Sequence, residues 1–181
     1  MIIDHYRTKE GQDIVMVQDR HFNIMAHDFE HGENFKIGYH NIIHHDVKIG
    51  DNVEIKSNVE LRPGTVIGDN CYIDSGVKSS GLNRIGNGVT LRYDCIIARG
   101  CEIGDRTYIS PQIMTNNLNS QREQVGGAVV GEDCFIGTQA VLNAGIEIAS
   151  GSIVGSCAFV GKSIEEPGIY VGVPAKLIKR L

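Results

Sequence analysis

The side chains that could act on a small molecule gather in two short segments of the chain. The segment from Thr115 to Val129 is rich in groups that can hydrogen-bond a polar ligand. These groups belong to Asn116, Asn117, Asn119, Gln121, Arg122 and Glu123. Earlier in the chain, Arg92-Tyr93-Asp94 places a cation, a phenol and a carboxylate side by side. A carboxylate can orient an ammonium group or accept its proton, and an amide can hold a substrate in position.

A six-residue repeat must position both segments. From Ile37 to Ile109, twelve of the thirteen residues found at steps of six are Ile or Leu, and Ser79 is the exception. The fourth residue after each is mostly small or β-branched, as at Val47 and Cys71, which suits a tight interior corner. The same period resumes at Val130 and continues to Val160. Self-similarity at a fixed period is typical of a solenoid.

A longer period, of three hexapeptides, lies on top of the six. Ile-Gly followed by Asp or Asn recurs at Ile49, Ile67, Ile85 and Ile103. Gly and Asn adopt positive φ at low cost, so each occurrence marks the same corner of a coil. Three hexapeptides therefore close one coil, and the pattern predicts a three-sided prism of short parallel strands stacked at about 4.8 Å.

The regular pattern covers only part of the chain. We expect residues 1–36 to cap the N-terminal end and residues 37–166 to form the β-helix, since terminal repeats need a cap. Residues 167–181 are expected to form a tail, with a short C-terminal helix from Ala175 onward after Pro174 ends the strands.

One interruption of the repeat is large. Counting forward from Ile103 places the next Gly-Asp corner at position 121, but it occurs at Val130-Gly131-Glu132-Asp133, nine residues late. Residues 115–129 are therefore predicted to form a protruding loop. A loop of this length on a rigid scaffold is usually functional or disordered, so a solvated surface loop is the alternative.

Composition restricts the classes of function. A formal net charge of −5 argues against a nucleic-acid surface, and no apolar run is long enough to cross a bilayer. We expect no signal peptide at the N-terminus. Four of the five cysteines fall at the inward corner, where a free thiol packs as a small hydrophobe; these are Cys71, Cys95, Cys101 and Cys134. Cys157 falls one place earlier in its repeat. Cysteines that pack as free thiols rather than forming disulfides favour a reducing cytoplasm.

The repeat, the single loop and the tail Val171-Gly172-Val173-Pro174-Ala175-Lys176 together resemble the hexapeptide-repeat (isoleucine-patch) acetyltransferases. The loop is opened by Ile109-Ser110-Pro111 and Thr115-Asn116-Asn117, where the family commonly has Ile-Gly-Pro and Phe-Thr-Asn. Before the tail, only Lys162 of Gly161-Lys162-Ser163-Ile164 matches the family pattern. The resemblance implies an all-β fold, the single-stranded left-handed parallel β-helix. It is closest in look to sugar-nucleotide N-acetyltransferases.

The resemblance also implies a cofactor and an assembly. Family members are homotrimers, with acetyl-CoA as co-substrate in the cleft between two prisms. The backbone of Gly137, Thr138 and Gly155 would then approach the pantetheine, because glycine allows close approach. Lys162 and Lys176 would meet the CoA phosphates, with ordinary surface charge as the alternative for both.

The histidines bear on which acceptor is acetylated. All seven lie at or before His45, and the coil of His45 is four coils, about 19 Å, from the coil of Ile109. A general base must lie within hydrogen-bond reach of its proton, so no histidine should serve the loop, even from a three-fold neighbour at the same height. His40, His44 and His45 share one coil, whereas a zinc site in this fold takes ligands from separate coils. We therefore predict no metal.

An amine acceptor removes the need for a base, because a neutral amine attacks a thioester without prior deprotonation. The sequence thus predicts an acetyl-CoA-dependent N-acetyltransferase acting on a nucleotide-linked amino sugar, with Asp94 and Asn116 as candidate catalytic residues. Candidate substrate-binding residues are Arg92, Tyr93, Asn117 and Glu123. The alternatives are a sugar or antibiotic O-acetyltransferase and a non-enzymatic hexapeptide scaffold protein, since a fold does not by itself give a function.

Overall fold

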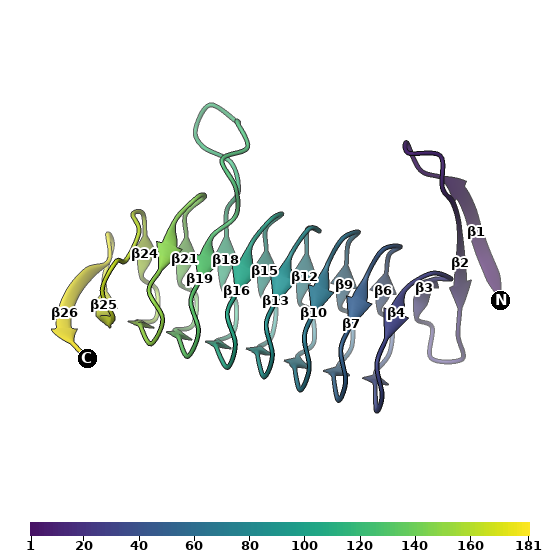
Figure 1. The fold of residues 1–181 in the computed structure, drawn as a ribbon, viewed down its shortest axis with the longest axis horizontal. Coiled ribbons are helices and arrows are strands. Elements are labelled where there is room, and N and C mark those ends of the chain that lie inside the picture. Colours follow the sequence, from purple (N-terminus) through teal and green to yellow (C-terminus); the bar gives the residue numbers. More distant parts are fainter.

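The protein is a long three-sided β-helix (Figure 1). The computed structural model describes residues 1–181, except for the side chain of Ile2. It consists of 26 strands joined by short turns, and the described residues include no helix that could span a membrane. We name the three sheets face A, face B and face C.

Face A holds ten strands, in the spatial order β1 (Ile2–Arg7), β2 (Asp13–Gln18), β3 (Ile24–Ala26), β6 (Ile42–Ile43), β9 (Glu60–Leu61), β12 (Lys78–Ser79), β15 (Ile96–Ile97), β18 (Met114–Thr115), β21 (Val141–Leu142) and β24 (Phe159–Val160). Face B holds β4 (Glu30–His31), β7 (Lys48–Ile49), β10 (Val66–Ile67), β13 (Arg84–Ile85), β16 (Glu102–Ile103), β19 (Val129–Val130) and β22 (Glu147–Ile148). Face C holds β5 (Lys36–Ile37), β8 (Glu54–Ile55), β11 (Tyr72–Ile73), β14 (Thr90–Leu91), β17 (Tyr108–Ile109), β20 (Phe135–Ile136), β23 (Ile153–Val154), β25 (Gly168–Val171) and β26 (Lys176–Arg180).

Successive coils stack in parallel, and each residue pairs with the one three hexapeptides further along the chain. On face B, for example, Val66 pairs with Arg84 and Ile67 pairs with Ile85. From β6 to β24, the second side chain of each two-residue strand points inward and is buried, as at Ile55 and Ile97. Each such side chain contributes about 1.5–3 kcal/mol by leaving water. The prism of parallel strands predicted from the repeat is confirmed, and so is the left-handed parallel β-helix implied by the resemblance, with about eight coils.

Turns form three edges along the prism, and most of them have four residues. The A–B edge comprises residues 44–47, 62–65, 80–83, 98–101, the longer segment 116–128, 143–146 and, after β24, residues 161–163. The B–C edge comprises residues 32–35, 50–53, 68–71, 86–89, 104–107, 131–134 and 149–152. The C–A edge comprises residues 38–41, 56–59, 74–77, 92–95, 110–113, 137–140 and 155–158.

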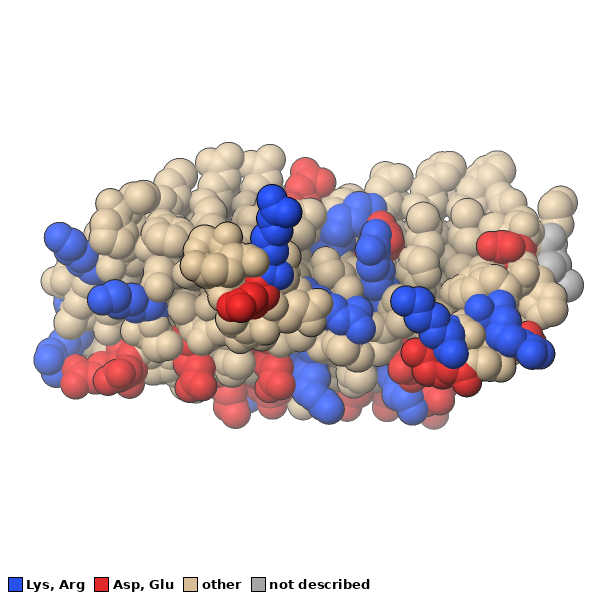
Figure 2. Space-filling model, turned by 90° about the horizontal axis from the view of Figure 1, so that it is seen from above, with Lys and Arg blue, Asp and Glu red and all other residues tan. Residues whose placement is uncertain are grey.

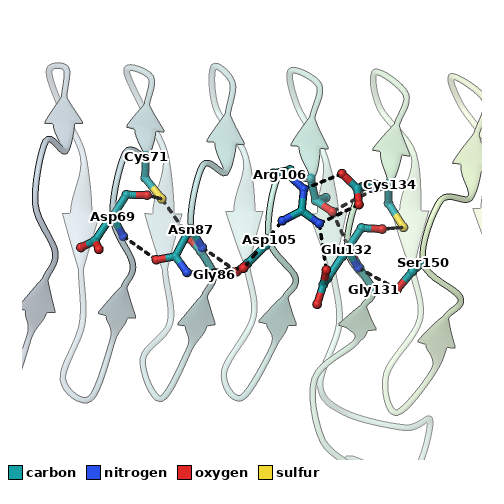
Figure 3. Close-up of polar contacts among 12 residues, drawn as sticks. Asp69, Cys71, Gly86, Asn87, Asp105, Arg106, Gly131, Glu132, Cys134 and Ser150 are labelled. Carbon is teal, nitrogen blue, oxygen red and sulfur yellow. Dashed lines mark hydrogen bonds and ion pairs between the residues drawn. The ribbon is translucent and has the colours of Figure 1, made fainter.

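The B–C edge is a ladder of side chains that cap backbone amides of the preceding coil (Figure 3). The amide of Asp69 donates to Oδ1 of Asn87 at 2.9 Å, and the amide of Asn87 donates to Oδ1 of Asp105 at 2.7 Å. In the next coil the backbone amide of Glu132 likewise donates to the hydroxyl of Ser150. This contact is the physical reason for the Gly-Asp or Gly-Asn corners that recur along this edge.

At Ser79, where the repeat lacks its inward Ile or Leu, the buried side chains form a polar network. The hydroxyl of Ser79 lies 2.6 Å from that of Thr65 and donates to Oδ1 of Asn83 at 2.6 Å. Asn83 in turn donates to the carbonyl of Ala98. Because each buried polar group has a partner, the coil keeps its path although an inward Ile is missing.

The two ends of the prism differ from expectation. Coils begin before residue 37, since β3 pairs in parallel with β6 and β4 with β7. The cap proper is the antiparallel hairpin β1–β2, which extends face A. The predicted C-terminal helix is wrong: residues 176–180 form β26, which pairs antiparallel with β25. The free edge of β25 offers hydrogen bonds in the last coil, and a strand takes them where a helix could not.

The cysteines take the inward corner as predicted. Four are buried, and Cys157 is exposed. Burial raises the pKa of all four buried thiols, and it raises that of Cys95 to about 11. Their role is therefore to fill the core.

We expect the native protein to show one fast thiol. At pH 8 only about a thousandth of Cys95 is thiolate, so it and the other buried cysteines should react with dithiobis(nitrobenzoate) far more slowly than Cys157. Timed absorbance should give one fast equivalent per chain in buffer and five in guanidinium chloride. Cys157→Ser should remove the fast phase, and a fast phase that persists in this variant would contradict the assignment.

Candidate functional site

A single finger of chain projects from the A–B edge (Figure 1). On face B, Ile85 of β13 pairs with Ile103 of β16 in the regular register, but Ile103 then pairs with Val130 of β19, and this second step is nine residues longer than the first. Gly145 donates to the carbonyl of Gly126 just as Gly100 donates to that of Gly81, so Gly126 occupies an ordinary turn position. The inserted residues are therefore 117–125, which we call the finger.

The finger is a small hairpin with its own hydrogen bonds. Leu118 bridges Gln124 in antiparallel fashion, and Val125 donates to the carbonyl of Asn117. The side chain of Asn119 accepts from the amides of Gln121 and Glu123 and donates to the carboxylate of Glu123 at 2.8 Å. The carboxylate of Glu123 is thus held within the finger, and Asn116 lies at its base in the first turn position.

The coils on both sides of the finger are tied together on the B–C edge. Arg106 donates from Nε and Nη2 to the carboxylate of Asp133, at 2.8 and 2.7 Å, and from Nη2 to Glu132 at 2.9 Å. Hydrogen bonds to the two carboxylates raise the pKa of Arg106. The bidentate geometry keeps the two coils in register across the insertion (Figure 3).

The predicted residues Arg92, Tyr93 and Asp94 form one turn of the C–A edge. The Nε of Arg92 lies 3.1 Å from Oδ2 of Asp74, one coil earlier, and its guanidinium stacks 5.2 Å from the ring of Tyr93. Asp94 has a φ of 57°, the left-handed corner that every coil requires there and that Asp tolerates. Its side chain is exposed, so the turn role and a ligand role are compatible.

Asp74 is a residue that sequence reasoning missed. It is only 1% exposed, and it also accepts from the amide of Ser75. A buried carboxylate needs a partner, and Arg92 supplies it. The signal was present in the sequence, because Asp74 and Arg92 occupy equivalent positions of successive coils, where opposite charges must stack in this fold.

Gly137 and Gly155, which are predicted to approach a cofactor, lie where the next coil leaves no room for a side chain. A Cβ on Gly137 would lie 2.5 Å from the amide nitrogen of Ser156, and one on Gly155 would lie 2.7 Å from Val171. The group that comes close belongs in both cases to the next coil of the same chain, its backbone at Gly137 and the side chain of Val171 at Gly155. Thr138 lies between them on the C–A edge, where its carbonyl accepts from Cys157.

The two predicted phosphate-binding lysines share one pocket. Lys162 and Lys176 both line a cavity of about 460 Å³ at the C-terminal end of the prism. Phe159, Tyr170 and Pro174 give it an apolar wall. Residues from the A–B edge and from β26 thus meet there, although they are distant in sequence.

The structure groups the predicted residues on separate edges of one chain. Asn116, Asn117, Glu123 and Lys162 lie on the A–B edge. The turn 92–94 and the Gly137, Thr138 and Gly155 positions lie on the C–A edge, across face A. A single copy therefore does not bring Asp94 and Asn116 together.

The histidines are also placed apart from the finger. His44 and His45 follow β6, which is four strands from β18 on face A. His44 lies 3.6 Å from Glu60, and burial lowers its pKa. His45 packs edge-on against Tyr6, and His40 is on the C–A edge, so the three do not converge.

The sequence profile of the bacterial transferase hexapeptide (six repeats) matches residues 30–63, 48–78 and 127–162. These residues make up just under half of the chain, and over them the chain is similar to this hexapeptide-repeat family. Among curated proteins, a chloramphenicol acetyltransferase of Escherichia coli is 40% identical to this chain over 58 residues. The matched segment covers 32% of this chain and 28% of the relative. The chain is 38% identical over 55 residues to a probable macrolide acetyltransferase of Lysinibacillus sphaericus, covering 30% and 31%. The match thus spans less than a third of either relative.

Solved structures share the fold of this hexapeptide-repeat protein. LpxA, a UDP-N-acetylglucosamine acyltransferase from Bacteroides fragilis, superposes with a TM-score of 0.69 at 18% identity, over 86% of this chain and 71% of that one. A variant of AntD, an N-acyltransferase from Bacillus cereus, in complex with dTDP and coenzyme A, superposes with a TM-score of 0.51 at 20% identity, over 84% and 85%.

Deleting the finger should leave the β-helix intact. Removal of residues 117–125 restores the regular register and joins Asn116 to Gly126-Gly127-Ala128, a four-residue turn. Because surface loops cost little to shorten, we expect an unchanged β-sheet circular dichroism spectrum and a midpoint of thermal unfolding within about 5 °C of the parent. Deletion of residues 120–128 is the control, because it removes the same number of residues but takes away the turn residues Gly126 and Gly127 and the buried Ala128. Equal stability of both variants would contradict this assignment of the insertion.

Proposed function

We propose that this protein is an acetyltransferase that transfers the acetyl group of acetyl-CoA to the amino group of a nucleotide-linked amino sugar. The observation that carries the proposal is the finger: one built hairpin on an otherwise uniform prism, rich in amides and four strands away from His44 and His45. The acetyltransferase relatives and the fold shared with AntD support the reaction class.

The chemistry that suits this arrangement needs no histidine base. A neutral amine attacks the thioester carbonyl, the new C–N bond forms as the C–S bond breaks, and the departing CoA thiolate takes the amine proton. Positioning then supplies most of the rate, since a well-oriented pair of reactants gains up to about 7–11 kcal/mol over free reactants. A finger of amides on a rigid coil can provide that positioning.

Each candidate residue has a role in this scheme. The side-chain amide of Asn116 donates to the thioester oxygen as negative charge develops on it. The carboxylate of Asp94 orients the acceptor nitrogen, and Arg92 with Tyr93 forms a flat cationic surface against the sugar. Asn117 and Glu123, at the base and tip of the finger, contact sugar hydroxyls.

The site is proposed to form between copies in a homotrimer. Asn116 on the A–B edge of one copy would face Asp94 on the C–A edge of the next. The outward side chains of faces A and C support such contacts, because they are apolar over the later coils, whereas those of face B are mostly charged. On face A these are Ile96, Met114, Val141 and Phe159; on face C they are Tyr108, Phe135 and Ile153.

Acetyl-CoA is proposed to lie along the later coils. The cavity with Lys162 and Lys176 fits the CoA phosphates, because two cations flank an apolar wall at its end of the prism. The pantetheine would then pass the C–A edge of a neighbouring copy at Gly137, Thr138 and Gly155. This arrangement brings the thioester toward the finger.

A hydroxyl acceptor is the second candidate. The sequence relatives act on chloramphenicol and, by name, on macrolides, and chloramphenicol offers hydroxyl groups and no amine. A scaffold without enzymatic activity is a third reading, but a scaffold has no use for a lysine-lined cavity and a finger on one edge.

Thiol release from acetyl-CoA should occur with amino sugar nucleotides and not with matched hydroxy sugar nucleotides or chloramphenicol. The Cys157→Ser protein removes the background of the exposed thiol in a dithiobis(nitrobenzoate) assay. Asn116→Ala and Asp94→Asn should each lower kcat at least about tenfold, the loss expected when an interaction of the transition state is removed. Asn143→Ala, the same turn position one coil later, should leave kcat unchanged. Release only with hydroxyl acceptors would overturn the amine assignment.

Neutralising the two cavity lysines should weaken acetyl-CoA binding. For Lys162→Gln with Lys176→Gln we expect at least about a tenfold rise in Kd by calorimetry, and a weaker dependence of Kd on salt, because two cations near the phosphates are lost. Lys36→Gln, at the other end of the prism, is the matched control. A Kd that the double substitution does not alter would place the CoA phosphates elsewhere.

A further inference from the structure

Asp74 is a buried carboxylate that the proposed chemistry does not use, and it lies against a residue that is proposed to contact the acceptor. Its Oδ1 accepts from the amide of Ser75 at 2.9 Å, and its Oδ2 lies 3.1 Å from Nε of Arg92, one coil later. The carboxylate is thus held on one side by its own turn and on the other by the guanidinium of Arg92.

Charged residues occupy this column of the prism in three successive coils. The first positions of the C–A turns are, in chain order, Gly38, Lys56, Asp74, Arg92, Ser110, Gly137 and Gly155. Lys56 is engaged with other groups, because it pairs with Glu54 and lies 5.5 Å from the ring centroid of Tyr72. Arg92 is therefore the cation that pairs with Asp74.

Asp94 folds back over the same turn as Arg92 does. A Cβ built on Gly76 would lie 2.0 Å from Oδ1 of Asp94, so this carboxylate fills the place that a side chain at position 76 would take. Gly76 has a φ of +80°, a conformation that favours glycine. The turn 74–77 therefore supports two residues of the next coil, since Asp74 holds Arg92 and Gly76 leaves room for Asp94.

The pair of Asp74 with Arg92 contributes little as a stabilising contact. Its two facing atoms, Oδ2 and Nε, are shielded from solvent, and neither forms a hydrogen bond of good geometry with a residue that the structure describes. Desolvation of two buried charges offsets their attraction unless hydrogen bonds complete the pair. A buried ion pair that stabilises so little, placed beside a candidate site, points to a role in orienting Arg92.

The outer end of the Arg92 guanidinium is left for a ligand. The ion pair engages Nε, and the two terminal nitrogens have no partner among the described residues. The guanidinium lies 5.2 Å from the ring centroid of Tyr93, and 34% of the side chain is exposed. Two terminal nitrogens in one rigid plane can donate together to two oxygens of a ligand.

Asp74 and Asp94 also stand apart from the main acidic edge. The acidic ladder of the B–C edge includes Asp51, Asp69 and Asp105. Figure 2 shows acidic side chains concentrated along one rim of the molecule. On the C–A edge the sequence has two carboxylates, Asp74 and Asp94, and both lie at the turn 74–77.

We propose that Asp74 is a positioning residue for the acceptor. It holds Arg92 against Tyr93, so that the terminal nitrogens of Arg92 donate to oxygens of the acceptor sugar while Asp94 orients the amine. This inference rests on the proposed function and adds to it a residue that does not itself touch the substrate. Arg92 contacts the sugar away from the reacting nitrogen, so its contacts are equally strong before and during transfer. Their loss should therefore raise KM and leave kcat nearly unchanged.

The test is a double-mutant cycle on the KM for the acceptor, measured by thiol release in the full-length Cys157→Ser protein. Asp74→Asn keeps the size of the side chain and removes its charge. It should raise the acceptor KM at least about tenfold, with kcat within about twofold of the parent and the KM for acetyl-CoA unchanged. Arg92→Gln should give a similar rise. The double variant should match Arg92→Gln alone, because Asp74 acts only through Arg92.

Two further variants separate positioning from a structural role. Glu54→Gln breaks the ion pair with Lys56 one coil earlier, and this matched control should keep the KM of the parent. Arg92→Lys keeps a charge beside Asp74 but has no planar fork, so it should raise the acceptor KM while the midpoint of thermal unfolding stays that of the parent.

A crystal structure of Asp74→Asn gives a readout that does not depend on activity, because the guanidinium of Arg92 should leave the ring of Tyr93. Three results would overturn the inference: an unmoved guanidinium, an acceptor KM that Asp74→Asn does not change, or a cycle in which the two substitutions act independently. Failure of the proposed function is separate, because the parent itself would then release no thiol with any amino sugar nucleotide.

Discussion

The stacking of one coil on the next in a constant register of three hexapeptides is the constraint on which the rest of the structure depends. Each coil must present the same inward shape at the same place, since strands lie about 4.8 Å apart and side chains contact their equivalents directly. Gly50 illustrates how little room is left, because a Cβ there would lie 2.2 Å from Oδ1 of Asp69. An inward position can hold a polar side chain only if the buried polar groups find hydrogen-bond partners, as those of Ser79 and Asn83 do.

A scaffold this uniform leaves variation to its edges and ends. The finger is inserted at a turn, where it adds nine residues without disturbing the stacking of β16 on β19. The lysine cavity forms where the last coil ends, and a second cavity, lined in part by Tyr6, Ile42 and His44, forms where the first begins. Because face A separates the A–B and C–A edges of one chain, the proposed chemistry is a property of neighbouring copies.

The repeat predicted those parts of the candidate site whose position on the prism follows from their position in the period. Counting by whole coils located the finger, because position in the period fixes position on the prism. It did not pair Lys162 with Lys176, which meet through the return of β26. It also passed over Asp74, whose partner lies one coil away.

The sequence by itself determined the fold class, the inward residues and the size of the insertion, since all three are carried by local periodicity and each residue meets its own equivalent. Only the tertiary structure decided the conformation of the last residues and which residues distant in sequence come into contact. Residues 176–180 form a strand rather than a helix because β25 presents a free edge to them. Lys162 and Lys176 line one cavity because β26 returns past the last coil. Such contacts depend on which surfaces lie next to one another in space, and a period in the sequence does not contain that information.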